Sequence, residues 1–172
     1  MPGNLSELAP MESAQMWAFL DQAKQIRLAT RRNSRTPVFV SAHWFVCRDK
    51  AVYVPLDPEA PFLADSPALQ QILGLEKGKR FSAVVDEGDE LTNRRSVHFS
   101  GTAAPVTRAK LREDLLDRVL VKYFYVNHPH LEPYLNRGSI EARRWFKLVP
   151  EEIDAWDLRS LPQPQSVERL YL

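Results

Sequence analysis

The sequence of 172 residues is short of cysteine and glycine, and it has no excess of charge of either sign. Cys47 is the single cysteine, which excludes an internal disulfide and a zinc site built from several cysteines. Only six glycines are present, and no glycine-rich loop follows a predicted strand, which excludes a P-loop and a dinucleotide-binding fingerprint. With 23 basic and 22 acidic residues, bulk charge gives no argument for binding to nucleic acid or to an anionic membrane.

Long hydrophobic runs are also missing. No apolar stretch approaches the roughly 20 residues that cross a bilayer. The first seven residues, MPGNLSE, lack the basic region and apolar core of a signal peptide. Together with the lone thiol, this predicts a cytoplasmic protein. The composition, 44% hydrophobic and 26% charged, is that of a globular domain that buries a core without metal or disulfides.

The chain is rich in short β-forming runs joined by polar turns. Helical spacing of apolar residues predicts a helix over residues 11–24, and further helices are expected over 68–75, 108–125 and 128–137. Six strands are predicted, over residues 26–30, 37–47, 51–54, 80–85, 95–106 and 144–149. Residues 153–158 extend the last strand or pair at an edge, and Gly101 marks a bulge. Short turns favour a mainly β fold, an antiparallel six-stranded barrel with flanking helices and a helical pair inserted before the last core strand.

The order of these elements resembles the FMN-binding split barrels of the pyridoxamine 5'-phosphate oxidase-like family. Each motif is weak alone, and their ordered combination carries the resemblance over about residues 12–159. The matching segments are Arg27–Thr30 (RLAT), Pro37–Val46, Ala51–Val54 (AVYV), Arg80–Asp86 (RFSAVVD), Val97–Ala103 (VHFSGTA) and Trp145–Asp157 (WFKLVPEEIDAWD).

The resemblance implies a domain over residues 12–159 with short tails at 1–11 and 160–172. It also implies a homodimer that holds FMN or a deazaflavin in a groove between the subunits. The expected activity is that of an FMN-dependent oxidoreductase on an unknown small molecule. The cofactor would supply the chemistry, and no catalytic residue is assigned. Two alternatives stay open: a deazaflavin-dependent reductase, and a non-enzymatic split barrel that binds another small molecule. An RNA-contacting barrel is a third, weaker class.

One segment departs from the family pattern. Family members carry basic residues after the third strand that hold the cofactor phosphate. Here no lysine or arginine lies between Lys50 and Lys77, and Asp57, Glu59 and Asp65 stand in that stretch. Because a dianionic phosphate is repelled by carboxylates, we expect it to meet other residues. The predicted cofactor-binding residues are Arg27, Lys79, Arg80, Arg94 and Arg95, with help from Thr30, Ser41 and His43.

Trp44 and Phe45 are adjacent in a predicted strand, so their side chains point to opposite faces. One of them belongs in the core, and the other, which we take to be Trp44, faces the cofactor groove or the dimer contact. The basic turn at Arg31, Arg32 and Arg35 is interpreted as a solvated turn, with an anionic ligand or RNA as the alternative.

Two further features are given structural interpretations. His128 and His130 flank a proline, and three convergent ligands are not evident, so no metal site is predicted. Cys47 has no visible base beside it, so we predict a buried structural thiol and not a nucleophile.

Overall fold

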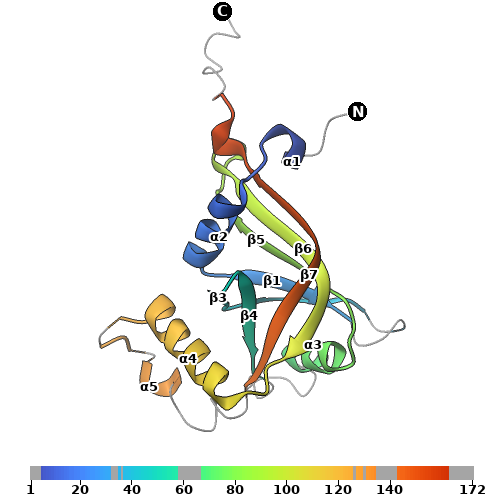
Figure 1. The fold of residues 1–172 in the computed structure, drawn as a ribbon, viewed down its shortest axis with the longest axis vertical. Helices are drawn as coiled ribbons and strands as arrows, with labels where there is room; N and C mark the ends of the chain where they lie inside the picture. The colour runs from blue at the N-terminus through green and yellow to red at the C-terminus, as the bar shows by residue number, and fades with distance from the viewer. Residues whose placement is uncertain are drawn as a thin grey trace, which may run out of the picture.

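The fold is an antiparallel sheet of seven strands that curls into a half-barrel around a hydrophobic interior (Figure 1). The structure is a computed structural model that describes residues 5–31, 35, 37–57, 67–125, 127–129, 131–134 and 143–162. In these ranges the strands run in the order β2-β1-β5-β6-β7-β4-β3, and every neighbouring pair is antiparallel. Their bounds are β1 (Ile26–Thr30), β2 (Phe39–His43), β3 (Val46–Arg48), β4 (Ala51–Leu56), β5 (Phe81–Glu87), β6 (Arg95–Pro105) and β7 (Arg144–Asp157).

Helices lie at the margins of the sheet. In Figure 1 β6 and β7 run the length of the molecule, and α4 lies beside the end of the sheet where β3 and β4 are found. The described helices are α1 (Leu5–Leu8), α2 (Ser13–Gln22), α3 (Pro67–Glu76), α4 (Ala109–Tyr123) and α5 (Leu131–Tyr134), with 3-10 turns η1 (Leu91–Asn93) and η2 (Leu158–Ser160). The pair α4 and α5 precedes β7, which confirms the predicted helical pair before the last core strand.

The predicted strand count of six is wrong, because the run over residues 37–47 is two strands. β2 pairs with β1, whereas β3 pairs with β4, so the chain changes partner at Trp44 and Phe45. The Tyr123 hydroxyl accepts a hydrogen bond from the Phe45 amide at 2.9 Å and lies 2.8 Å from the Phe45 carbonyl oxygen. A side chain from α4 thereby takes the place of a strand partner, which satisfies the backbone where the run breaks.

The interior of the half-barrel holds the main core. Alternation along β1 turns Ile26, Leu28 and Thr30 inward, and leaves Arg27 and Ala29 on the outer face. The inner residues of the strands pack against α2 and α3. The largest fully buried apolar side chains of this core are Phe19, Phe45, Phe81, Phe146, Leu20, Ile26, Leu28, Leu56, Leu75 and Leu148.

A second, smaller cluster lies on the outer face of β3, β4 and β7. Tyr53 and Trp145 face outward from β4 and β7, and Leu115 and Val119 of α4 cover them. Over β2, β1, β5 and β6 the outward side chains are exposed instead, among them Arg27, Val40, Ser82 and His98. The outer face of the sheet is therefore covered at one end and open at the other in the described residues.

The helix α2 is shorter than the predicted span of residues 11–24. Its first turn is closed by a capping box, in which the Gln15 side chain accepts a hydrogen bond from the Glu12 amide at 3.0 Å. Its buried residues are Met16, Phe19 and Leu20, as the spacing predicts. Before α2 the chain pairs with β7, through the bridge between Pro10 and Trp156, and Ala9 is buried.

One turn and one bulge follow directly from local chemistry. Asp49 and Lys50 both adopt positive φ in the two-residue turn between β3 and β4, which is the turn geometry that suits an antiparallel hairpin. The pairing register of β6 and β7 shifts between Ser100 and Gly101, which confirms the predicted bulge. A Cβ atom at Gly101 would lie 2.1 Å from the Val149 carbonyl oxygen, so only glycine fits this close approach.

The proline-rich segment of residues 55–67 begins inside a strand. Pro55 and Leu56 belong to β4, where β7 is the only described strand that pairs with them, because β3 has already ended. A strand with one open side tolerates proline. Residues 58–66, which include Glu59 and Asp65, lie outside the described residues, and Pro67 is the first residue of α3.

Candidate functional site

A cleft of about 560 Å³ lies on the outer face of the sheet, where β1 ends and β5 begins. We call it the strand-end cleft. The pairing of Thr30 with Phe81 joins the two strands at this point, and Ser100 of β6 is the direct partner of Ser82. The polar residues that line the cleft are Thr30, Arg31, Lys79, Arg80, Ser82, Ser100 and Glu152.

The strand-end cleft gathers three exposed cations, Arg31, Lys79 and Arg80. Arg80 forms an ion pair with Glu151, and its hydrogen bond to that carboxylate raises the pKa of the guanidinium. The Ser100 hydroxyl donates to Glu152 at 3.0 Å. The cations therefore outnumber the two carboxylates at this edge, an arrangement that favours an anionic group.

Three of the predicted cofactor-binding residues come together in this cleft, namely Thr30, Lys79 and Arg80. The Thr30 hydroxyl donates to the Arg80 carbonyl oxygen at 3.2 Å, which ties the end of β1 to the residue before β5. Arg31, which the sequence reasoning assigned to a solvated turn, lies in the same cleft. Its position directly after the RLAT strand is the signal that could have singled it out.

Ser41 and His43 point to the inner face and contact α3. Their side chains meet the buried side chain of Gln71, with the Ser41 hydroxyl 2.9 Å and His43 Nε2 2.8 Å from Gln71 Oε1. Gln71 also donates to the Leu28 carbonyl oxygen at 2.7 Å. Burial lowers the pKa of His43, which favours the neutral imidazole. Sequence reasoning missed Gln71, a lone amide among the apolar residues of a short helix.

Arg27 and Arg95 lie apart from the strand-end cleft. Arg27 forms an ion pair with Asp86 on the open outer face. Arg95 pairs with Glu87 at 2.7 Å, and its guanidinium lies 4.4 Å from the centre of the Phe19 ring of α2. Both arginines are thus occupied by contacts within the chain that stabilise the ends of strands.

Trp44 and Arg94 also lie elsewhere. Trp44 stacks on Tyr123 with the ring centres 4.7 Å apart and meets the edge of Phe124, while Phe45 is fully buried. This confirms the prediction that Trp44 and Phe45 point to different faces, with Phe45 in the core. The Trp44 ring packs against Tyr123 at the end of α4 and against Phe124 just after it. Arg94 is exposed just before β6.

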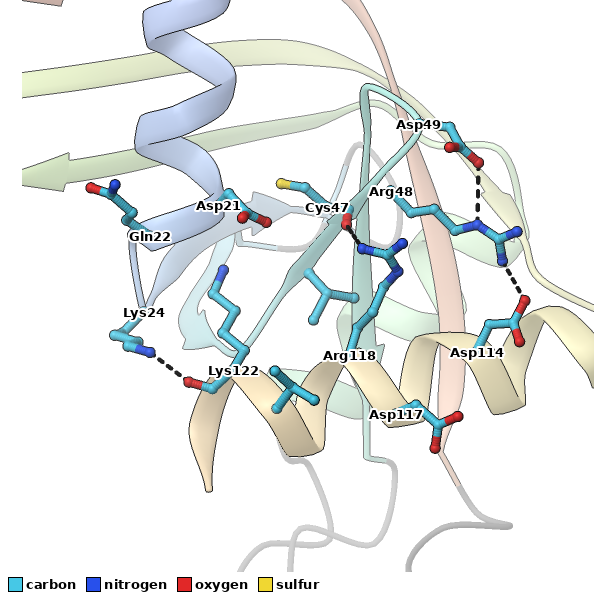
Figure 2. Close-up of a pocket in the computed structure, with 12 residues that line it drawn as sticks. Asp21, Gln22, Lys24, Cys47, Arg48, Asp49, Asp114, Asp117, Arg118 and Lys122 are labelled. Carbon is cyan, nitrogen blue, oxygen red and sulfur yellow. Dashed lines mark hydrogen bonds and ion pairs between the residues drawn. The ribbon is translucent and has the colours of Figure 1, made fainter. Parts of the chain in front are cut away.

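A second cleft, of about 780 Å³, lies between the end of α2, the β3–β4 hairpin and α4 (Figure 2). We call it the α4 cleft. Burial raises the pKa of the Cys47 thiol to about 11, so this thiol is protonated at neutral pH, in line with the structural role predicted for it. Burial also lowers the pKa of Lys122 to about 8. Sequence reasoning missed this lysine because nothing local marks it as half-buried.

The described residues hold no group of three or more histidine, cysteine, aspartate or glutamate side chains that could bind a metal ion. Among the same residues, no helix is both long enough and apolar enough to cross a membrane.

No family model matches the sequence, and no curated protein matches it. Solved structures do match the fold. A conserved hypothetical protein of Mycobacterium tuberculosis aligns with a TM-score of 0.71 and 20% identity, over 92% of this chain and 93% of that one. The FAD and heme binding protein of Mycobacterium smegmatis aligns at 0.62 with 13% identity, over 93% and 77%. A candidate pyridoxamine 5'-phosphate oxidase of Listeria innocua aligns at 0.56 with 15% identity, over 86% and 98%.

These likenesses establish the class of fold. The curled antiparallel sheet is the fold that this chain shares with these solved structures. The chain has the pyridoxamine 5'-phosphate oxidase-like fold that its ordered motifs predict.

Proposed function

We propose that this protein is a flavin-binding split barrel that takes FMN as its cofactor and acts as an oxidoreductase on a small molecule. The fold likeness supports the proposal, because the matching structures include an FAD and heme binding protein and a candidate pyridoxamine 5'-phosphate oxidase. The observation that carries the choice of FMN is the convergence of Arg31, Lys79 and Arg80 in the strand-end cleft.

The residues of the strand-end cleft fit the phosphate end of FMN. A phosphate monoester needs cations and hydroxyl or amide donors within reach. Arg31 and Lys79 offer exposed positive charge, and the Ser82 hydroxyl lies beside them on the same face. Glu152 is held by Ser100, and Glu151 by Arg80, which limits the repulsion from these carboxylates. This cleft therefore replaces the basic segment that the acidic stretch after β4 lacks.

When bound, FMN supplies the electron and hydride transfer, which explains why the proposal assigns no nucleophile or acid–base pair. The task of this chain is to bind and orient. The cations of the strand-end cleft would fix the phosphate. The open outer face, with Arg27 and His98 among its side chains, would shape the space next to it. The substrate is a small molecule that the flavin can oxidise or reduce, and the proposal does not identify it further.

We also propose that the protein is a homodimer and that the cofactor lies between the two subunits. Exposed apolar side chains on β2 and β7 support this arrangement, because Val40 is 60% and Ile153 is 51% exposed. We expect sedimentation at micromolar concentration to give the mass of two chains. A monomer would contradict the dimer and the cofactor groove between subunits.

The test is a titration of the purified protein with FMN and with riboflavin, after its visible spectrum has been recorded. Replacing Arg31 or Lys79 by alanine should weaken FMN binding by roughly 10- to 100-fold, because a charge-assisted contact to phosphate is worth about 1.5–3 kcal/mol. Riboflavin lacks the phosphate and should bind both variants as it binds the parent. Lys110→Ala, an exposed lysine on α4, is the matched control and should change neither affinity.

Each outcome decides between the alternatives. If the variants bind FMN as tightly as the parent, the phosphate is not held in the strand-end cleft. If the parent binds a deazaflavin but not FMN, the protein is a deazaflavin-dependent reductase. If it binds no flavin of either kind, the non-enzymatic alternative replaces the proposed oxidoreductase.

A further inference from the structure

The α4 cleft presents a line of polar residues that the flavin proposal does not use. Asp114, Arg118 and Lys122 follow one another at intervals of four residues, so they lie on the same face of α4 (Figure 2). Arg48 of β3 binds Asp114 at 2.7 Å and also binds Asp49. Because Asp114 is taken by Arg48, it is not available to Arg118 one turn further along the helix.

Arg118 therefore keeps donors for a ligand. Its Nη1 donates to the Cys47 carbonyl oxygen at 3.2 Å, and within the described part of the chain it forms no ion pair with a carboxylate. The side chain is exposed on the cleft side of α4 (Figure 2). A guanidinium with a fixed orientation and free N–H groups is the side chain best suited to bind a carboxylate in two-point contact.

Lys122 extends into the same cleft one turn away, toward Asp21 and Cys47 (Figure 2). Its Nζ donates to the Leu20 carbonyl oxygen at 3.3 Å and lies 3.8 Å from the centre of the Phe45 ring. Among the described residues no carboxylate lies within ion-pair distance of it. Burial of the amine disfavours its charged form, whereas the backbone carbonyl and the face of the aromatic ring both favour that form.

The groups that face the Lys122 amine shift its pKa in opposite directions. Burial is the largest effect and lowers the pKa of Lys122, Cys47 and Asp21 raise it, and Lys24 lowers it, so that the pKa of Lys122 is about 8. At pH 8 about half of such a lysine is the free amine, compared with about 0.3% of a lysine at its ordinary pKa. The free amine is the nucleophilic form of lysine.

We propose that the α4 cleft binds short oxo acids, with the ligand carboxylate on Arg118 and the ligand carbonyl carbon bonded to Lys122 as an imine. The two residues are separated by one helical turn, a rise of about 6 Å, which suits a ligand with two to four carbon atoms. This activity is separate from flavin binding, and the two clefts share no lining residue.

The reaction balances without a further reactant. The Lys122 nitrogen attacks the carbonyl carbon and a C–N bond forms. One proton moves from nitrogen to the former carbonyl oxygen, which becomes a hydroxyl group. The second N–H proton then moves to this hydroxyl group, which leaves as water while the C=N bond is made. Asp21 lines the same cleft and its charge acts on Lys122, so we assign to this carboxylate the relay of the protons through a water molecule. Hydrolysis of the imine reverses each step.

The experiment is reductive trapping of the full chain with glyoxylate and sodium cyanoborohydride at pH 7.5, followed by peptide mapping. Trapping at Lys122 adds the mass of glyoxylate less one oxygen atom to the peptide that contains this residue. The α-amino group and the exposed Lys77 and Lys110 report the background. We expect Lys122 to be modified at least tenfold faster than either exposed lysine, because its free-amine fraction is larger.

Two variants test the two halves of the site. Lys122→Arg keeps the positive charge and should abolish trapping in that peptide. Arg118→Gln should slow trapping of glyoxylate by roughly tenfold and leave trapping of the neutral propionaldehyde unchanged. Modification confined to the α-amino group, or equal at Lys122 and the exposed lysines, overturns the imine. Equal loss of both aldehydes in Arg118→Gln overturns the oxo-acid assignment. Since trapping in the parent needs no variant, a variant that does not fold does not weaken the test.

Discussion

The two faces of the sheet are built differently. The inner face is lined by aromatic and aliphatic side chains that are almost fully buried, with α2 and α3 closing it. The outer face is covered only where α4 lies on β3, β4 and β7, and the rest carries exposed charged and small polar side chains. The inner face therefore carries the stability of the fold, while both clefts open where the packing is thinner.

The largest effect is expected on the inner face. Phe146→Ala removes a ring that is 1% exposed in the centre of the main core, and it should lower the free energy of unfolding by about 3–5 kcal/mol. Denaturant unfolding followed by circular dichroism measures this. A loss under about 1 kcal/mol would show that the interior is loosely packed, and the contrast between the faces would fail.

A smaller loss is expected beneath α4. Leu115→Ala should cost about 2–3 kcal/mol, at the low end for a buried leucine, because a helix on a small cluster can shift into the space left behind. Val121→Ala on the same helix is the control, since Val121 is 85% exposed, and it should stay within about 0.5 kcal/mol of the parent. A loss as large as that of Phe146→Ala would show that the two faces contribute equally to the stability of the fold.

The α4 cleft should give stability a pH dependence of known sign. The pKa of Lys122 falls from 10.5 to about 8 on folding, so between these values the unfolded chain holds a proton that the folded chain has released. Stability therefore rises with pH in that window. From pH 8 to 9 the parent should gain about 1 kcal/mol relative to Lys122→Met, measured by urea unfolding. Parallel pH curves for the two proteins would contradict a half-buried amine.

Cys47 should give stability a pH dependence of the opposite sign, which serves as a check. Its pKa rises from 9.0 to about 11 on folding, so the unfolded chain loses the thiol proton first and stability falls as pH rises above 9. Relative to Cys47→Ala, the parent should therefore lose only about 0.3 kcal/mol from pH 8 to 9 and about 1 kcal/mol from pH 9 to 10. A larger loss already from pH 8 to 9 would show that the thiol and the amine titrate as one unit.

The smallest effect is expected on the open outer face. The side chains of Arg27 and Asp86 are 49% and 43% exposed, so their ion pair should contribute only about 0.2–1 kcal/mol. A double-mutant cycle with Arg27→Met and Asp86→Asn measures this coupling, which should shrink further at high salt. A coupling above about 2 kcal/mol would mean that this face is covered in solution, as the proposed dimer could bring about.

Much of the fold could be predicted from the sequence because its determinants are local. Alternating apolar residues marked β1, β5 and β6, and the spacing of Met16, Phe19 and Leu20 marked α2. Gly101 could be recognised as a bulge, since a glycine inside a strand indicates a close approach of the backbone. The break between β2 and β3 could not, because the Tyr123 hydroxyl that replaces the strand partner lies 78 residues away.

The same distinction between local determinants and distant contacts applies to the candidate site. The motif order predicted the split-barrel fold, and Thr30, Lys79 and Arg80 could be named from their places at strand ends. Which side chains share a cleft was decided only by the tertiary structure. Ser41 and His43 turn inward to Gln71 because α3 covers that face, and Arg95 rests on the Phe19 ring because α2 lies there. The lowered pKa of Lys122 has the same origin. The sequence determines which groups can carry charge, whereas burial, which depends on how distant helices pack on the sheet, decides which of them lose it.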